Sequence, residues 1–153
     1  MSQLTTATLS KGLEEIGEGA FAECTSLNEI LIPPAVKVIS GMTFYQCTQL
    51  KTVILGEGLE EIEEKAFQEC TLLHEISIPN AVKAIKDGAF SLCSQMTTVN
   101  LGKGLEEIGE GAFIGCSSLH EILVPSAVKA IKDGAFSQCS QMTTVILGEG
   151  CKR

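Results

Sequence analysis

Apolar residues recur along the chain with a fixed period of 23 residues. The period is clearest in the six phenylalanines, Phe21, Phe44, Phe67, Phe90, Phe113 and Phe136. Six of the seven cysteines keep the same spacing: Cys24, Cys47, Cys70, Cys93, Cys116 and Cys139. A constant period in this range is typical of a solenoid, in which each unit buries its apolar face only by stacking on its neighbours.

Each unit carries one segment with the pattern of a short strand. In the first unit, Leu27, Ile30 and Ile32 form an L-x-x-L-x-L pattern, and the last two alternate with outward residues. Alternation of this kind predicts a strand, which Pro33, or Gly56 in the next unit, would end. The other side of the unit, such as GEGAFAEC, contains glycines and no sustained helical period. We expect an irregular or one-turn helical arc there.

The units alternate between two kinds, so the true repeat is a pair of 46 residues that occurs three times. One kind begins GLEEI, at Gly12, Gly58 and Gly104, and the other begins AVK, at Ala35, Ala81 and Ala127. The chain opens with the second half of a unit. We therefore expect a single domain over 1–153, with a partial repeat at 1–11, six repeats over 12–149 and a short tail at 150–153.

The repeated signature AF-x-x-C-x-x-L-x-x-I-x-I-P resembles the BspA-type leucine-rich repeats of bacterial and protist surface proteins. The resemblance covers essentially the whole chain. It implies an α/β repeat solenoid, a right-handed leucine-rich-repeat superhelix with one short parallel strand per unit and an irregular or short-helical convex side. It also implies a module that binds other proteins, often in adhesion.

The chain departs from the general leucine-rich pattern at the third residue after the strand. Asparagine or cysteine is typical of that position, but the residues here are Ala35, Gly58, Ala81, Gly104, Ala127 and Gly150. No asparagine ladder can form, and we expect these small residues to let the backbone turn inward instead.

Composition narrows the classes of function. The net charge is −8 and the pI is about 4.7, which disfavours binding to nucleic acid or to an anionic membrane. No apolar run approaches the roughly 20 residues of a membrane helix, and the first residues lack the features of a secretory signal. The compartment stays open: the resemblance suggests the cell surface or secretion, and reduced cysteines also suit the cytoplasm.

Candidate chemistry is sparse. Each repeating cysteine lies between a phenylalanine and a leucine, the setting of a small buried hydrophobe, and no C-x-x-C motif suggests zinc. His74 and His120 are equivalent residues two units apart, so roughly 10 Å separates their backbones, and neither a metal site nor a catalytic triad can be built from them. We expect no enzyme activity, no cofactor and no metal.

One charged column alternates in sign from unit to unit. It consists of Glu14, Lys37, Glu60, Lys83, Glu106 and Lys129. Opposite charges on adjacent strands attract, although each exposed pair contributes little. We interpret this column as a structural ladder that favours the stacking of unlike units.

The outward residues of the strands are the candidate binding site, because in leucine-rich solenoids this sheet lines the concave side and such faces bind partners. Four large aliphatic side chains in two pairs are hard to explain as solvated surface, although strand propensity alone also favours such residues. The partner-binding residues that we predict are Glu29, Leu31, Thr52, Ile54, Glu75, Ser77, Thr98, Asn100, Glu121, Leu123, Thr144 and Ile146.

These observations support two hypotheses of function. The leading one is a non-enzymatic protein-interaction module that binds a protein partner through the concave sheet. The alternative is a purely structural array, a section of a longer solenoid or an engineered scaffold, which associates with itself. Both ends of the chain lack a polar terminal unit, and Cys151 replaces a core leucine at the last turn. We therefore expect a homodimer through the C-terminal end, in which Cys151 is either a simple replacement or a thiol that links chains.

Overall fold

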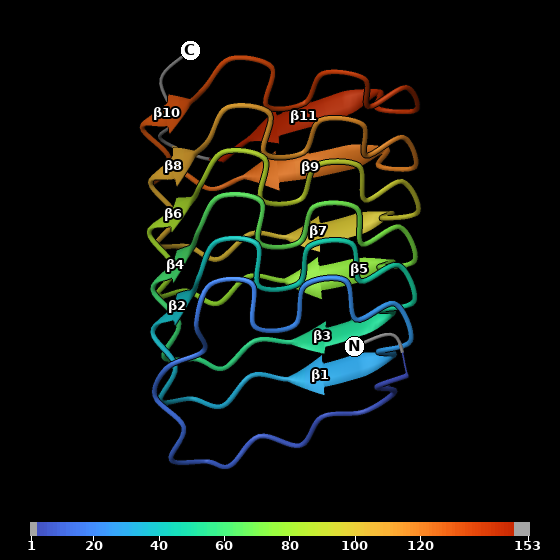
Figure 1. The fold of residues 1–153 in the computed structure, drawn as a ribbon. Helices are drawn as coiled ribbons and strands as arrows, with labels where there is room; N and C mark the ends of the chain where they lie inside the picture. Colours follow the sequence, from blue (N-terminus) through green and yellow to red (C-terminus); the bar gives the residue numbers. More distant parts are fainter. Residues whose placement is uncertain (1–2, 149–153) are drawn as a thin grey trace.

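The computed structural model describes residues 3–148, and in them the chain coils into a stack of parallel strands (Figure 1). Each turn carries a longer strand on one side. These strands are β1 (Glu29–Leu31), β3 (Thr52–Ile54), β5 (Glu75–Ser77), β7 (Thr98–Asn100), β9 (Glu121–Val124) and β11 (Thr144–Leu147). Equivalent residues 23 positions apart face one another, as Glu29 faces Thr52. The predicted stacking of 23-residue units is confirmed.

A second strand in each turn was not expected from the sequence. These strands are two residues long: β2 (Val38–Ile39), β4 (Glu61–Ile62), β6 (Ala84–Ile85), β8 (Glu107–Ile108) and β10 (Ala130–Ile131). They pair in parallel into one five-stranded sheet in the order β10-β8-β6-β4-β2. Two residues are too few to show an alternating pattern, so only the register with neighbouring turns reveals them.

Of the two forms that the sequence allows for the arc, irregular or one-turn helical, the irregular one is found. Residues 3–148 contain no helix, so the α/β class is not confirmed, and they contain none that could span a membrane. The arc that leads from the two-residue strand to the cysteine has two left-handed positions in every unit. In the second unit they are Met42 and Gln46, both with φ of 56°. An α-helix needs an unbroken run of right-handed residues, so two left-handed residues four positions apart prevent one.

Backbone hydrogen bonds in the arc alternate between the unit itself and the next unit. The amide of Tyr45 donates to the carbonyl of Met42 within the turn at 3.1 Å, whereas that of Phe44 donates to Ala66 in the next turn at 2.8 Å. The same alternation recurs along the stack. The irregular arc is therefore a hydrogen-bonded part of the solenoid.

Stacked phenylalanines and buried thiols form the centre of the core. Successive phenylalanine rings lie nearly parallel with centroids 5.1–5.6 Å apart, within the range of favourable aromatic pairs. Each cysteine from Cys47 to Cys139 donates its Sγ–H to the carbonyl oxygen of a phenylalanine in the preceding turn, at 3.0–3.2 Å. Cysteine is thus both a small apolar group and a donor here.

Small residues after the longer strand do bring adjacent turns close together, as the sequence predicts. A Cβ added at Gly58 would overlap the carbonyl oxygen of Pro34, and one at Gly104 would overlap that of Asn80. Backbone passes backbone at these corners, which leaves no room for a side chain.

Candidate functional site

The strand face consists of the outward side chains of β1, β3, β5, β7, β9 and β11. Strand residues alternate between the two sides of the sheet. In β1, β3, β5 and β7 the first and third residues are exposed and the second is buried. All twelve residues that the sequence predicts for this site are exposed. The structure therefore places them on one surface, and their role in binding stays a prediction.

Two pairs of aliphatic side chains lie on the strand face. Leu31 stands opposite Ile54, and Leu123 stands opposite Ile146. The exposed fractions of Leu31, Ile54 and Leu123 are 59%, 56% and 55%. These values far exceed those of the inward residues of the same strands. The solenoid leaves these side chains in water, where they are available for contact with another molecule.

A polar patch separates the two aliphatic pairs. It contains Ser77 and Asn100, which occupy the same column of the face, and the Asn100 side-chain amide donates to the Ser77 hydroxyl at 3.3 Å. The neighbouring column alternates between glutamate and threonine. Within residues 3–148, no ion pair shorter than 4 Å involves its three glutamates, Glu29, Glu75 and Glu121.

The strand face is not one continuous sheet. Within residues 3–148, β1 pairs with β3, β5 with β7 and β9 with β11, but no ladder joins β3 to β5 or β7 to β9. A hollow of about 490 Å³ lies at the first interruption, lined by residues 51–55, 57 and 75–80. The two interruptions could not be predicted from the sequence, because the strand pattern of every unit is the same.

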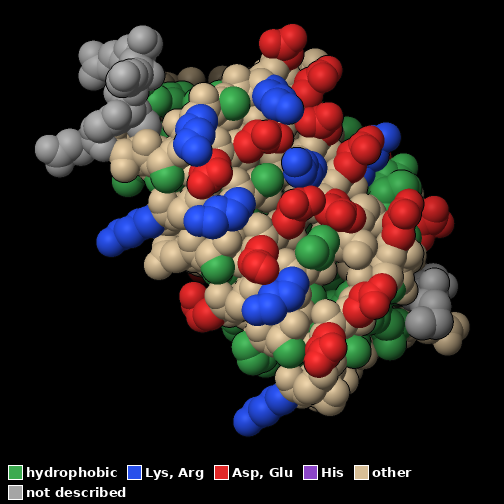
Figure 2. All heavy atoms as spheres, turned by 90° about the vertical axis from the view of Figure 1, so that its left-hand side faces the viewer, with side chains coloured by type: hydrophobic (Ala, Val, Ile, Leu, Met, Phe, Trp, Pro, Cys, Tyr) green, Lys and Arg blue, Asp and Glu red, His purple; other side chains and the backbone are tan. Residues whose placement is uncertain are grey.

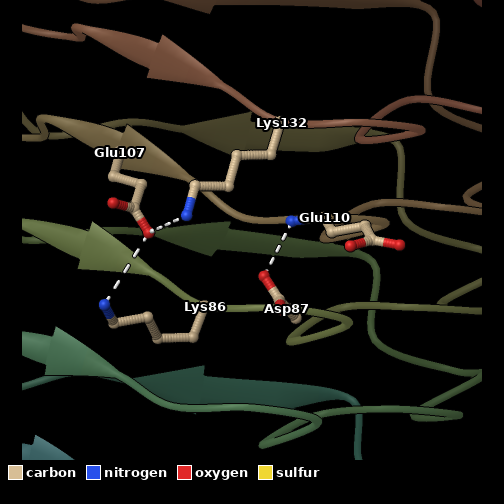
Figure 3. Close-up of polar contacts among 5 residues, drawn as sticks. All are labelled: Lys86, Asp87, Glu107, Glu110 and Lys132. Atoms are coloured by element: carbon tan, nitrogen blue, oxygen red, sulfur yellow. Dashed lines mark hydrogen bonds and ion pairs between the residues drawn. The ribbon is translucent and has the colours of Figure 1, made fainter.

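The five-stranded sheet carries a different surface, which is covered by interspersed basic and acidic side chains (Figure 2). On β8, one carboxylate oxygen of Glu107 lies 3.7 Å from the ammonium of Lys86 in the preceding turn and 3.5 Å from that of Lys132 in the following turn (Figure 3). The Asp87 carboxylate also accepts a hydrogen bond from the backbone amide of Glu110 at 2.8 Å. These contacts link adjacent turns.

The predicted charge ladder is only partly realised. Among the described residues, Lys129 and Glu106 are its one pair within 4 Å, with 3.8 Å between the ammonium and the carboxylate. The closer cross-turn pairs involve Glu107 instead, one position further along. An exposed lysine gains little stability from being held in one ion-pair geometry. The alternation of glutamate and lysine in the sequence therefore does not ensure ion pairs along the whole column.

A hollow on this second surface is mainly acidic. Glu18, Glu61, Glu63 and Glu64 line it, with Lys65, Lys86 and Lys132 among the other lining residues. Within residues 3–148 no group of three or more histidine, cysteine or acidic residues could hold a metal ion. The contacts there include the Lys65–Glu64 ion pair within one turn and ion pairs and hydrogen bonds between turns.

The cysteine column is buried, as predicted, from Cys24 to Cys139. Burial raises the pKa of Cys47 to about 12, and it raises the pKa of Cys70 and Cys93 above the ordinary range. A thiol that stays protonated is a poor nucleophile and a poor metal ligand. Cys151, the candidate linking thiol, lies outside the described residues.

His74 and His120 both lie on the exposed surface just before the strands β5 and β9. Their backbone carbonyls accept hydrogen bonds from Thr97 and Thr143 of the next turn. The structure therefore gives these positions a part in the backbone ladder.

Comparison with known proteins identifies the family. The model of the BspA type leucine rich repeat region matches residues 1–116 and 60–153, with six copies. The chain belongs to the BspA-type leucine-rich repeat proteins. Among curated protein sequences, none matches it significantly.

Solved structures agree with this family. A leucine-rich repeat protein from Bacteroides ovatus is 34% identical with a TM-score of 0.90, and the match covers 97% of this chain and 39% of that protein. The T. pallidum leucine rich repeat protein is 32% identical with a TM-score of 0.83, over 92% of this chain and 72% of that one. The pneumococcal vaccine antigen PcpA is 26% identical with a TM-score of 0.70, over 97% and 35%. The chain thus spans well under half the length of the first and third of these proteins.

Proposed function

We propose that the chain is a non-enzymatic interaction module that binds a protein partner through the strand face. The observation that carries this proposal is the exposure of Leu31, Ile54, Leu123 and Ile146 on the outward side of the longer strands. The inward residues of β1, β3 and β9 are buried. Membership of a family of leucine-rich repeat proteins, in which the strand side commonly binds, supports the same surface. Adhesion is the form of binding that the family suggests.

Covering exposed aliphatic side chains of this kind with a partner lowers the free energy of the complex. Removing apolar surface from water contributes about 25 cal/mol per Å², and a few well-placed anchors usually dominate the energy of an interface. The two pairs flank a patch that hydrogen-bonds within itself through Ser77 and Asn100. A partner would therefore be anchored at two places and pass over a polar centre.

The chain itself supplies substitutions that test this proposal without disturbing the fold. Ser77 is the equivalent of Leu31 and Leu123 in the same kind of unit, and Asn100 is the equivalent of Ile54 and Ile146 in the other kind. A variant with serine and asparagine at all four aliphatic positions should therefore fold like the wild type. As a control, Leu92→Gln removes an exposed aliphatic side chain in the arc, where the equivalent residue of a later unit is Gln138.

Peptide binders selected from a displayed library against the wild type provide the measurement. We expect the fourfold variant to lose most of its affinity for these binders and the Leu92→Gln variant to keep it. Binders that recognise the wild type and the fourfold variant equally would contradict a binding role of the strand face.

A specific observation favours self-association through the C-terminal turn as a second function. Ile131 and Val145 are 43% and 44% exposed, whereas their equivalents Ile108 and Ile122 are 0% and 1% exposed. Apolar core positions and open strand edges both recruit another chain. Light scattering at micromolar concentration should then give the mass of a dimer, and Ile131→Lys should give a monomer. A monomeric mass for the wild type would exclude this dimer.

A further inference from the structure

The chemistry of the strand face repeats with every pair of units. Glu29, Glu75 and Glu121 occupy one column on every second strand, with a threonine between each two. Paired strands lie about 4.8 Å apart, and the stacked phenylalanine rings advance by 5.1–5.6 Å per unit. The phenylalanine stack is continuous where the strand ladder is interrupted, so two units advance along the solenoid by about 10–11 Å. We take this advance as the spacing of successive glutamates of the column.

An α-helix that lies along the solenoid axis has the same repeat. Seven residues advance about 10.5 Å along a helix and return to nearly the same face. An extended chain presents residues on one face about every 6.6–6.8 Å, which matches neither one unit nor two. A helix can therefore stay in step with the three pairs of units, whereas an extended chain cannot.

We infer that the strand face accepts an amphipathic helix of three heptads, one for each pair of units, with a basic residue in every heptad. The inference rests on the proposed function, because it names the kind of partner for the same surface. Lysine or arginine at seven-residue spacing faces Glu29, Glu75 and Glu121. Apolar residues in the first and third heptads lie on the two aliphatic pairs, and polar residues in the second heptad lie over Ser77 and Asn100.

The positions of the aliphatic pairs agree with this register. The Leu31–Ile54 pair and the Leu123–Ile146 pair are four strands apart, which is about 20 Å at the strand spacing. Two heptads of helix span about 21 Å. Apolar residues at the same place in the first and third heptads therefore reach both pairs, and the second heptad falls on the polar patch between them.

Charge favours a basic partner. The three glutamates of the column are exposed and form no ion pair within residues 3–148, whereas Glu107 on the five-stranded sheet lies between two lysines. The net charge of −8 adds a long-range attraction for cations. A lysine of the partner would meet carboxylates that form no ion pair with the cations of residues 3–148.

Synthetic three-heptad peptides test the inference directly. The in-phase peptide has leucine at the first and fifth positions of heptads one and three, glutamine there in heptad two, and lysine at the second position of every heptad. The out-of-phase peptide has the same composition with the lysines and leucines moved to a six-residue spacing. A proline-rich peptide of the same charge tests a polyproline helix, whose three-residue turn advances about 9.3 Å.

We expect fluorescence anisotropy to show that the in-phase peptide binds at least tenfold more tightly than the other two. Replacing the three glutamates of the column by glutamine should weaken this binding about tenfold at low salt, and less at high salt. The matched control makes the same change, with the same spacing, on the other surface, at Glu18, Glu64 and Glu110. This control should bind like the wild type.

The outcomes separate the two proposals. Equal binding of the in-phase and out-of-phase peptides overturns the helical partner, as does preferred binding of the proline-rich peptide. Equal effects of the two glutamine variants overturn the role of the glutamate column. If library binders still depend on the aliphatic pairs in any of these cases, the proposed function stands without a helix. If they do not, both proposals fail.

Discussion

Replacing Phe90 by alanine should weaken the solenoid at its centre. The Phe90 ring is wholly buried, with the rings of Phe67 and Phe113 at centroid distances of 5.1 and 5.4 Å on its two sides. Truncation of a buried phenylalanine costs about 3–5 kcal/mol, to which two favourable ring contacts of about 0.5–1.5 kcal/mol each contribute. A domain of this size has a total stability of only about 5–15 kcal/mol.

The effect should be visible as a lower unfolding temperature. One kcal/mol corresponds to about 2–4 °C for a chain of this length, so Phe90→Ala should lower Tm by about 6–20 °C. Circular dichroism suits the measurement, because the chain has no tryptophan. Units of a solenoid are stabilised mainly by their neighbours, so a void in the middle should also broaden the transition.

Phe21→Ala is the matched control for this substitution. Phe21 is only partly buried and has a ring neighbour on one side, Phe44, at 5.6 Å. We expect its replacement to cost less than half as much. Equal losses of stability at the two positions would refute the reasoning, because the phenylalanine column would then not be a continuous core.

Two further predictions concern the thiols and the corners of the turns. In a Cys151→Ser protein the repeating thiols should hardly react with a thiol reagent below pH 9, and all six should react on unfolding. Burial raises the pKa of Cys47 to about 12, so the folded state holds this proton more tightly than the unfolded state does. The resulting stabilisation is complete at low pH and should fall as the pH rises from about 8.5 towards 12. Rapid labelling, or a denaturation midpoint that is flat over this range, would contradict the prediction. Gly104→Ala should lower the free energy of unfolding in urea by about 1–3 kcal/mol, because the added Cβ overlaps the carbonyl oxygen of Asn80. The control Gly12→Ala, whose added Cβ meets no atom within 4 Å, should leave the free energy of unfolding nearly unchanged. Equal stability of the two variants would contradict the close packing of this corner.

The repeat made the stacked part of the fold predictable. Six phenylalanines and six cysteines at one spacing allow a single register, and in that register Glu29 must face Thr52. The twelve outward residues followed from the two-residue period of the strand, which is why all of them lie on the strand face.

Other features depend on backbone geometry that the sequence pattern does not reveal. The left-handed conformation of Met42 and Gln46, which prevents a helical arc, occurs at residues other than glycine. Neighbouring turns impose it through the bonds from Met42 to Glu64 and from Gln46 to Gln68. Likewise, the partners of Glu107 depend on where the long lysine side chains extend, which spacing alone does not determine.

Whether the strand face is the binding surface is best measured by amide hydrogen exchange of the protein with and without a library-selected binder. Binding should slow amide exchange in β1, β3, β9 and β11, which carry the aliphatic pairs. Exchange in the two-residue strands β2, β4, β6, β8 and β10 should stay unchanged. Because exchange reports local opening, the comparison with the free protein isolates the effect of the binder. Protection confined to the five-stranded sheet would contradict the account.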